Sequence, residues 1–322
     1  MKNNLYPLQF EPILKERIWG GEKLKSVLNK PITSKITGES WEISDVQGDV
    51  SLVSNGFLKG KSLTALIDSY PIAILGNVVY ERFGKHFPLL FKYLDARDDL
   101  SIQVHPNDEL AKKRHQSFGK TEMWYIMQAD ENAKVIVGFK EKSSPALYLD
   151  SLKQKTILTN LDSIQTKKGD VFFLETGTVH AIGAGLVIAE IQQTSDITYR
   201  IYDFDRVDVN GKMRELHVDL ALEAINYNVV DTKKEYPTVE NQSNEIVDCP
   251  YFTTNLIPLH GQLTIQNNGD SFKVYMCVEG HFDVITNGIR YAYQTGDTIL
   301  IPAAIDGFDL VGKASVLEIY IK

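Results

Sequence analysis

The sequence repeats one short stretch, first as Gly169-Asp170-Val171-Phe172-Phe173-Leu174-Glu175-Thr176-Gly177-Thr178-Val179-His180 and again as Gly296-Asp297-Thr298-Ile299-Leu300-Ile301-Pro302-Ala303-Ala304-Ile305-Asp306. Each copy is a Gly-Asp turn, then four mostly apolar residues suited to a strand, then a second turn. An internal repeat of this kind predicts two related β-barrels. His180 of the first copy falls opposite Asp306 of the second once the register slips, so we expect a metal ligand at this place only in the first barrel.

Around this repeat, short runs rich in aromatic and β-branched residues recur between Gly, Asp and Asn turns. They occupy residues 101–104, 123–128, 135–139, 171–174 and 186–192, and then 263–266, 273–278, 282–286, 298–301 and 315–321. Many short strands separated by turn signals are typical of a sandwich or barrel. Helical patterns interrupt them at about 62–84, 145–161 and 215–226. We therefore predict a mainly β protein with two barrels and small helical insertions.

The stretch 231–248 separates two β-rich parts. It is poor in apolar residues and contains Lys-Lys-Glu, Pro237 and Asn-Gln-Ser-Asn, so we interpret it as a linker or an exposed crossing. The expected domains are residues 1–230, which carry the candidate site and the helical insertions, and residues 231–322, which form a second, metal-free barrel.

Length and composition narrow the class of protein. The chain has 322 residues and a formal charge of 34 − 42 = −8, which disfavours nucleic acid as a partner because phosphate backbones are bound by clustered cations. No stretch approaches the roughly 20 apolar residues of a membrane span. The start lacks an apolar signal region. The two cysteines, Cys249 and Cys277, lie far apart and fit a reducing cytoplasm better than a disulfide framework. We expect a cytoplasmic enzyme or binding protein.

The densest cluster of potential ligands lies in residues 101–106, which read Ser-Ile-Gln-Val-His-Pro. If this segment is a strand, the side chains of Gln103 and His105 point to the same face. Seventeen residues later, Glu122 begins another predicted strand, and His180 lies in a turn that follows a third. These four residues are the candidate metal ligands.

Two imidazoles, a carboxylate and an amide oxygen form a mixed nitrogen and oxygen site. Such a site suits Zn²⁺, and also Fe²⁺ or Mn²⁺. Each residue alone has an ordinary structural explanation, since a single histidine at a strand end is usually a hydrogen-bonded group. Their combination on β-elements bracketed by glycine turns favours a metal. The remaining histidines lack such neighbours and are expected to be structural or solvated: His86, His115, His217, His260 and His281.

The candidate ligands belong to four longer motifs. In order these are Leu-Ser-Ile-Gln-Val-His-Pro-Asn-Asp at 100–108, Gly-Lys-Thr-Glu-Met-Trp-Tyr at 119–125, Gly-Thr-Val-His-Ala-Ile-Gly at 177–183 and Gln-Gln-Thr-Ser-Asp-Ile-Thr-Tyr-Arg at 192–200. Together with Ile-Trp-Gly-Gly at 18–21, Glu-Ser-Trp-Glu-Ile-Ser at 39–44 and Pro-Leu-Leu-Phe-Lys at 88–92, they resemble the shorter bacterial branch of the type I mannose-6-phosphate isomerases. The resemblance covers most of the chain, although the C-terminal part adds only the barrel signal.

The resemblance implies a fold, a reaction and a set of ligands. The fold would be two cupin-type, jelly-roll β-barrels, and the reaction would interconvert mannose 6-phosphate and fructose 6-phosphate with one Zn²⁺ per chain. The family's metal ligands match Gln103, His105, Glu122 and His180, and its active-site arginine matches Arg200. Two positions depart from the usual pattern, since Thr121 and Glu175 stand where many relatives have proline.

The proposed reaction sets further chemical requirements. Converting an aldose to its 2-ketose moves a proton from C2 to C1 through an enediolate, so the site needs a base and groups that stabilise an oxyanion. Arg200 is permanently charged and suits a phosphate or an oxyanion, and Lys92 and Lys120 are candidates for the same anions. The base is left open between a lysine with a lowered pKa, Asp196 and a metal-bound water.

Two other functions use the same residue types. A cupin oxygenase would use two histidines and a carboxylate to hold non-haem iron, and a sugar-binding cupin would hold its ligand without turnover. The additional ligand Gln103 and the set of Lys and Arg residues favour the isomerase. The expected substrate is a small hexose phosphate, and we expect a monomer or weak dimer that binds neither nucleic acid nor membrane.

Overall fold

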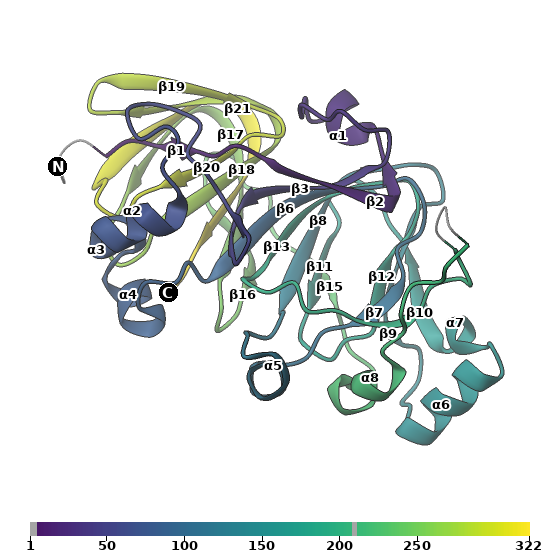
Figure 1. Ribbon diagram of the computed structural model, residues 1–322. Coiled ribbons are helices and arrows are strands. Elements are labelled where there is room, and N and C mark those ends of the chain that lie inside the picture. The colour runs from purple at the N-terminus through teal and green to yellow at the C-terminus, as the bar shows by residue number, and fades with distance from the viewer. Residues whose placement is uncertain (1–4, 208–210) are drawn as a thin grey trace.

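The computed structural model describes residues 5–207 and 211–322. Figure 1 shows two curved β units side by side, with the helices on the periphery. The predicted fold class, mainly β with cupin jelly rolls and small helical insertions, is confirmed. Within the described residues, no helix is both long enough and apolar enough to cross a membrane.

The first unit consists of two antiparallel sheets. One has five strands in the order β10 (Leu161–Gln165), β9 (Lys134–Phe139), β12 (His180–Ile182), β7 (Ile102–Val104) and β14 (Tyr199–Tyr202). The other has seven strands in the order β15 (Lys233–Lys234), β11 (Val171–Leu174), β8 (Glu122–Ala129), β13 (Leu186–Gln193), β6 (Leu89–Ala96), β3 (Thr37–Ile43) and β2 (Ile13–Gly21). A separate hairpin pairs β4 (Asp45–Val46) with β5 (Asp49–Val50).

The second unit is one strongly curved sheet. Its order is β1 (Leu8–Gln9), β20 (Thr298–Ile301), β18 (Lys273–Thr286), β21 (Gly307–Tyr320), β17 (Thr253–Gln266) and β16 (Asn244–Asp248), and β19 (Ile289–Gln294) also pairs with β18. The stretch 231–248 was predicted as a linker, but it contributes β15 and β16 to two different sheets. The first strand of the chain joins the C-terminal sheet. We propose that a domain boundary near residue 230 still separates most of the first unit from most of the second.

The three predicted helical regions are all present. Residues 62–84 form α2 (Leu63–Ser69), α3 (Pro71–Leu75) and α4 (Asn77–Phe83), residues 145–161 contain α6 (Pro145–Lys153) and α7 (Ile157–Asn160), and residues 215–226 contain α8 (Val218–Ala224). Two further helices, α1 (Lys23–Ser26) and α5 (Asp108–His115), were not predicted. In α5 only Ala111 is buried, so its sequence carries no apolar stripe to reveal it.

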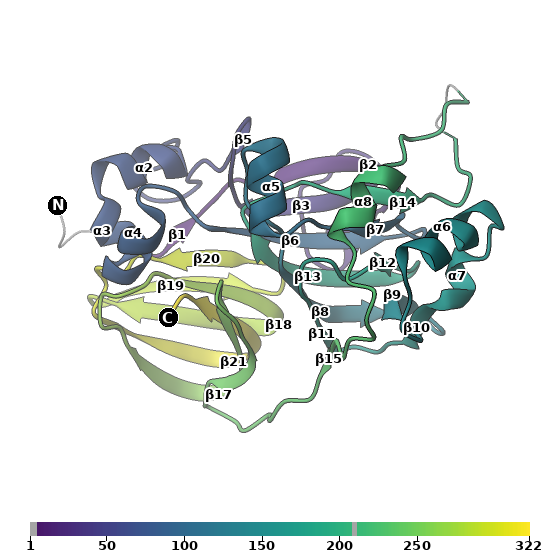
Figure 2. The same cartoon turned by 90° about the horizontal axis from the view of Figure 1, so that it is seen from below.

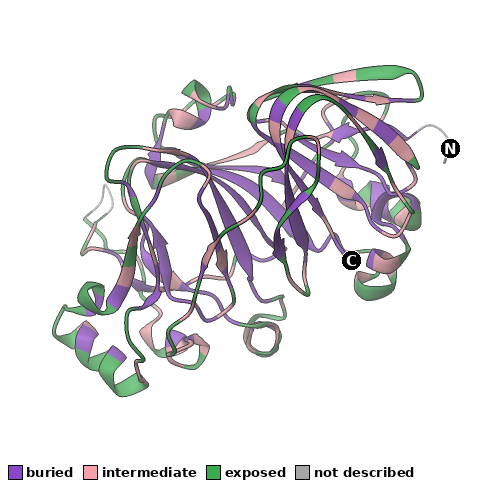
Figure 3. Ribbon diagram, turned by 180° about the vertical axis from the view of Figure 1, so that it is seen from behind, coloured by how far each residue is buried: buried purple, intermediate pink, exposed green. Residues whose placement is uncertain are grey.

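Both faces of the seven-stranded sheet of the first unit are covered. Along its strands, alternate side chains point into the first unit and toward the C-terminal unit. On β6, Lys92 faces the interior of the first unit, whereas its neighbours Phe91 and Tyr93 belong to a core that includes Phe272 and Leu300 of the C-terminal sheet. Figure 2 shows the two units in contact from below, and Figure 3 shows that the central strands are buried and the outer helices largely exposed. The C-terminal unit therefore supports the back of the sheet that carries site residues.

The helices α3 and α4 connect the two units through Gly76. Backbone amides of Asn77 and Val78 donate to the carbonyls of Gly269 and Asp270 at 3.1 and 3.0 Å. Gly76 has φ 95° and ψ 166°, a region open almost only to glycine. A Cβ atom at this position would lie 2.3 Å from the Asp270 carbonyl oxygen, so any side chain would separate the two units.

We expect Gly76→Ala to lower the free energy of unfolding by about 3 kcal/mol, since backbone strain and a clash with rigid backbone act together. The matched control is Gly60→Ala, because Gly60 has φ 82° but an added Cβ would meet nothing within 4 Å. The control should cost about 1 kcal/mol. Urea unfolding of both variants measures the difference, and equal losses would show that the contact with Asp270 contributes nothing.

Candidate metal centre and active site

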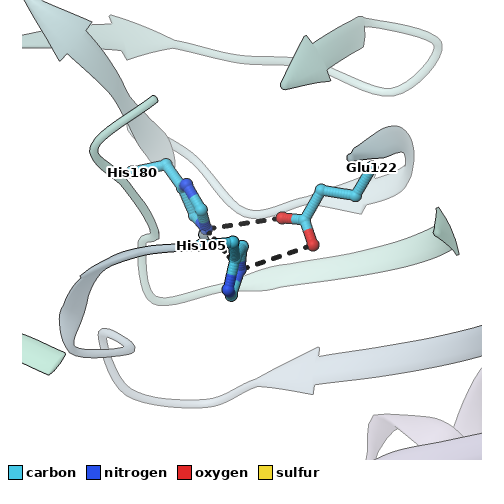
Figure 4. Close-up of side chains that lie close together, drawn as sticks. All are labelled: His105, Glu122 and His180. Carbon is cyan, nitrogen blue, oxygen red and sulfur yellow. Dashed lines mark hydrogen bonds and ion pairs between the residues drawn. The ribbon is translucent and has the colours of Figure 1, made fainter. Parts of the chain in front are cut away.

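Three of the predicted ligands meet in the interior of the first unit (Figure 4). The Nε2 atoms of His105 and His180 are 3.2 Å apart, and they lie 3.6 and 3.4 Å from the two carboxylate oxygens of Glu122. All three residues are at most 1% exposed. Among the described residues, no other group of three His, Cys, Asp or Glu side chains brings its ligand atoms within 4.8 Å of one another.

Strand register aligns the site residues of the five-stranded sheet. Gln103 on β7 pairs with His180 on β12 on one side and with Arg200 on β14 on the other. Directly paired residues of antiparallel strands share a face, so these three side chains point into the same interior. His180 is the first residue of β12, whereas the sequence predicted a turn there. Glu122 faces them from the first position of β8 in the opposite sheet.

Both imidazole rings are held in one orientation. The Nδ1 atom of His105 lies 2.8 Å from the Ile197 carbonyl oxygen, and Nδ1 of His180 lies 2.7 Å from that of Thr178. Each Nδ1 therefore carries the proton, and both Nε2 lone pairs face the same point. Burial, followed by the charge of Lys120, lowers the pKa of His180 to about 4 and that of His105 well below its usual value. Both rings are thus neutral, which is the form that binds a metal.

One oxygen of the Glu122 carboxylate has no hydrogen-bond partner. Its buried Oε1 atom accepts no hydrogen bond. Burial raises the pKa of Glu122 to about 7 even though the Lys120 ammonium stabilises the ionised form. Two converging imidazole lone pairs beside an unpartnered carboxylate oxygen therefore fit a divalent cation of the Zn²⁺ type. The Gln103 amide lies 3.2 Å from Nε2 of His180, and a flipped amide would present its oxygen to the same point.

Next to the ligands, a row of charged side chains lies on the seven-stranded sheet of the first unit. The Lys120 ammonium donates to Oε2 of Glu122 and lies 3.2 Å from Nε2 of His105 and 3.9 Å from Oε1 of Glu190. Lys92 forms an ion pair with the same Glu190 oxygen at 3.1 Å. Burial disfavours the charged form of Lys120, but the two carboxylates outweigh it and raise its pKa. Lys120 is therefore a cation in this arrangement, and a base role with a lowered pKa is not supported.

Gln103 and Lys120, which contact the three buried ligands, line a cavity of about 500 Å³. Five predicted site residues line it, namely Gln103, Lys92, Lys120, Asp196 and Arg200. Asp196 is exposed at the cavity, and Arg200 donates to the Ser101 hydroxyl at 3.3 Å and to the Glu215 carbonyl at 3.0 Å. The structure thus brings all eight predicted site residues into one region. Their catalytic roles remain proposals.

Several lining residues were not predicted. Glu190 accepts from Trp124 Nε1 at 3.1 Å, and its pKa is lowered to about 2, since Lys120 and Lys92 outweigh the effect of burial. At the entrance, Glu39 pairs with Arg17 at 2.9 Å, and Arg214 lies beside Arg200. Glu39 lies in the Glu-Ser-Trp-Glu motif that the sequence flagged. Glu190 and Arg214 carry no local signal, because only strand register and loop closure bring them to the cavity.

Three arginines gather at the entrance. Arg214 and Arg206 both pair with Asp203, at 2.5 Å each, so two guanidinium groups share the single negative charge of one carboxylate. Burial is the main cause that lowers the pKa of Arg200, and the charge of Arg214 is the next. The guanidinium groups of Arg200 and Arg214 line the cavity side by side and could donate to an anionic ligand.

Fold and site together define a cupin with a candidate metal centre next to a cavity lined by charged residues of both signs. Comparison with known proteins narrows this class. The family model "Phosphomannose isomerase type I, catalytic domain" matches residues 7–140, and "Mannose-6-phosphate isomerase, cupin domain" matches residues 242–321. The chain belongs to the type I mannose-6-phosphate isomerase family, as its motifs predicted.

Individual relatives are similar to this chain over nearly its whole length. The chain is 36% identical to the mannose-6-phosphate isomerase ManA of Bacillus subtilis, over 97% of this chain and 98% of that protein. It is 33% identical to the mannose-6-phosphate isomerase of Streptococcus mutans, over 97% of each. The crystal structure of a Bacillus subtilis mannose 6-phosphate isomerase superposes with a TM-score of 0.90 at 32% identity, covering 98% of this chain and 100% of that one.

Proposed function

We propose that this protein interconverts mannose 6-phosphate and fructose 6-phosphate with a bound Zn²⁺. The observation that carries the proposal is the buried His105–Glu122–His180 group, which contacts two residues of a cavity that arginines also line. The family membership supports the same substrate. The oxygenase alternative is disfavoured because iron and oxygen chemistry has no need for cations at the entrance.

The four candidate ligands would hold one zinc ion. When bound, such an ion polarises a carbonyl or hydroxyl oxygen of the sugar as a Lewis acid. The donor set of two neutral imidazoles, one carboxylate and one amide matches this role. Because Nδ1 of each histidine is tied to a backbone carbonyl, both rings already present Nε2 as the ligand atom.

The substrate would lie with its phosphate at the entrance and its C1–C2 end toward the ligands. Arg200 and Arg214 line the cavity and carry more positive charge than Asp203 offsets, so they would bind the phosphate. Lys92 and Lys120 lie deeper, 6% and 4% exposed, and their ammonium groups would stabilise negative charge on O1 and O2 of the enediolate. In this arrangement the arginines at the entrance would bind the substrate phosphate, and the buried lysines would stabilise the transition state.

Two carboxylates are placed to accept and return the proton. Asp196 lines the cavity from its exposed side, and Glu190 lines it from the seven-stranded sheet. Glu190 is ionised and its Oε1 atom contacts Lys92, which keeps the carboxylate oriented. Either side chain would move a proton between C2 and C1 while the lysines hold the oxygens. Exchange of the C2 hydrogen with solvent in Asp196→Asn and Glu190→Gln assigns the base.

The decisive experiment is a coupled assay for fructose 6-phosphate formation by the zinc-loaded protein. We expect turnover of mannose 6-phosphate and a loss of at least about a thousandfold in kcat/KM for unphosphorylated mannose, because remote binding energy is used at the reacting centre. The Arg200→Met variant should lose most of this preference for the phosphorylated sugar over the unphosphorylated one. Arg290→Met is the matched control for Arg200→Met, because Arg290 is an exposed arginine of the C-terminal unit.

Each alternative function has its own signature in these measurements. Sugar phosphate binding without turnover in zinc-loaded protein would indicate a non-catalytic binding cupin. Oxygen uptake with an iron-loaded protein, and no isomerisation, would indicate an oxygenase. Either result would overturn the proposed function.

A further inference from the structure

We infer that Asp108 is a positioning residue for the Lys120 and Glu122 side chains, and that Tyr251 of the C-terminal unit completes this role. Asp108 and Tyr251 are not among the residues that line the cavity, so both act through other groups. The inference rests on the proposed function, because positioning has meaning only for the reaction that Lys120 and Glu122 serve.

The Asp108 carboxylate collects three hydrogen bonds from three separate parts of the chain. Its Oδ1 atom accepts from the Gly119 backbone amide at 2.8 Å and from the Gln193 side-chain amide at 3.0 Å. Its Oδ2 atom accepts from the Tyr251 hydroxyl at 2.8 Å. A carboxylate can take all three donors at once, and hydrogen bonds to a charged acceptor are the strong ones.

Gln193 extends this contact to the other side of Lys120. Its side-chain oxygen accepts from the Thr121 amide at 2.9 Å, and its backbone amide donates to the Thr121 carbonyl at 3.1 Å. Lys120 therefore lies between two residues, Gly119 and Thr121, whose amides are both fixed through Asp108. The next residue is the ligand Glu122, at the start of β8. We call Asp108, Gln193 and Tyr251 the Asp108 cluster.

The segment before Lys120 has little freedom to move away from the cluster. A Cβ atom on Gly119 would lie 2.8 Å from the Asp108 backbone nitrogen, so this close approach needs glycine. On the other side, the Pro250 carbonyl accepts from Arg82 of α4 at 2.6 Å, which holds the connection between β16 and β17. The Tyr251 hydroxyl is thus presented from a connection that is itself anchored.

The consequence is a role for the C-terminal unit in the reaction. Tyr251 packs against the core shared by the two units and reaches Asp108 across a separation of 143 residues in sequence. Lys120 and Glu122 must keep their buried ammonium and carboxylate in contact, and small displacements of such groups matter for a reaction. Groups that orient such residues typically contribute 10–100-fold in activity or metal affinity.

The test compares Tyr251→Phe, Asp108→Asn and the double variant with the zinc-loaded parent. Tyr251→Phe removes one hydroxyl without changing shape, and it should lower kcat about tenfold while KM stays within about twofold. Asp108→Asn should lower kcat about 10–100-fold and weaken zinc binding about tenfold in competition with a chelator. The double variant should be no worse than Asp108→Asn alone, because the two groups act as one unit.

Tyr6→Phe is the matched control. The Tyr6 hydroxyl also makes tertiary hydrogen bonds, since it donates to the Asn55 carbonyl at 2.9 Å and accepts from the Leu58 amide at 3.0 Å, but at a place remote from the ligands. It should lower the melting temperature as much as Tyr251→Phe does and leave kcat and zinc affinity at parental values. Should Asp108→Asn fail to fold, Tyr251→Phe alone decides the matter.

The outcomes separate this inference from the proposed function. A zinc-loaded parent without turnover would refute the function, while zinc affinity would still report on the cluster. A parent that turns over, with parental kcat and zinc affinity in Tyr251→Phe, would overturn the inference. Strictly additive losses in the double variant would also overturn it, since they would show that Tyr251 does not act through Asp108.

Discussion

Replacing His105 by alanine is expected to remove stoichiometric zinc from the protein. The free energy of zinc binding is roughly 10–16 kcal/mol and is shared among four ligands. Removing one ligand should therefore weaken binding by about 3 kcal/mol or more, which is a hundredfold or more in affinity. His180→Ala should behave in the same way, because the two Nε2 atoms converge at 3.2 Å. Metal analysis after dialysis measures the loss. Gln103→Ala should lose less, since water can replace an amide oxygen.

The control for these variants is His260→Ala, because His260 is exposed in the C-terminal unit. Added zinc should raise the melting temperature of the parent and of the control, since a ligand that binds only the folded state stabilises it. It should have little effect on His105→Ala and His180→Ala. Full stoichiometric zinc in both of these variants would refute the metal centre.

Replacing Lys120 by methionine is expected to lower kcat by about a hundredfold to a thousandfold, the loss typical of removing one group that stabilises a developing oxyanion. KM should change much less, because the phosphate would be bound at the entrance. Lys120→Arg should not restore the rate, since a planar guanidinium cannot occupy the place of a compact ammonium that is 4% exposed. Steady-state kinetics of the zinc-loaded variants measure these effects.

The pH dependence of zinc uptake supplies a second readout for Lys120→Met. The Lys120 ammonium stabilises the ionised Glu122 carboxylate, whose pKa is about 7 in the metal-free protein. Without Lys120 this pKa rises further, so zinc must displace a more tightly held proton and uptake shifts to higher pH. Lys113→Met, on the exposed side of α5, is the control. Parental kcat and an unshifted uptake profile in Lys120→Met would remove Lys120 from the site.

Much of the site could be predicted because its members lie in short, locally ordered motifs. Gln103 lies in β7 and His105 directly follows that strand, two residues further on, and Glu122 begins a strand that the sequence also indicated. Glu190 was missed for a physical reason. It lies within the buried strand β13, and it reaches the cavity only because β13 pairs with β6 and β8, placing Glu190 opposite Lys92 and Trp124. Register between distant strands leaves no local trace.

The fold, too, could be predicted only where the signal is local in the sequence. The helices near 62–84 were predictable from their caps and apolar spacing, whereas α5 was not, because it buries almost nothing. The three strands of 14 residues in the C-terminal sheet were predicted only in part. Their more polar parts are stabilised by pairing, since β21 pairs with β17 over its full length and with β18 over most of it.

The sequence by itself determined the class of fold, the four candidate ligands and the family, because each depends on residues close together in the chain and on their order. Only the tertiary structure decided what surrounds those ligands. It placed Glu190 between two lysines, gathered the arginines at the entrance and brought Tyr251 to Asp108. The physical reason is that an ion pair or a buried hydrogen bond depends on distances of about 3 Å, and only packing sets such distances between remote segments.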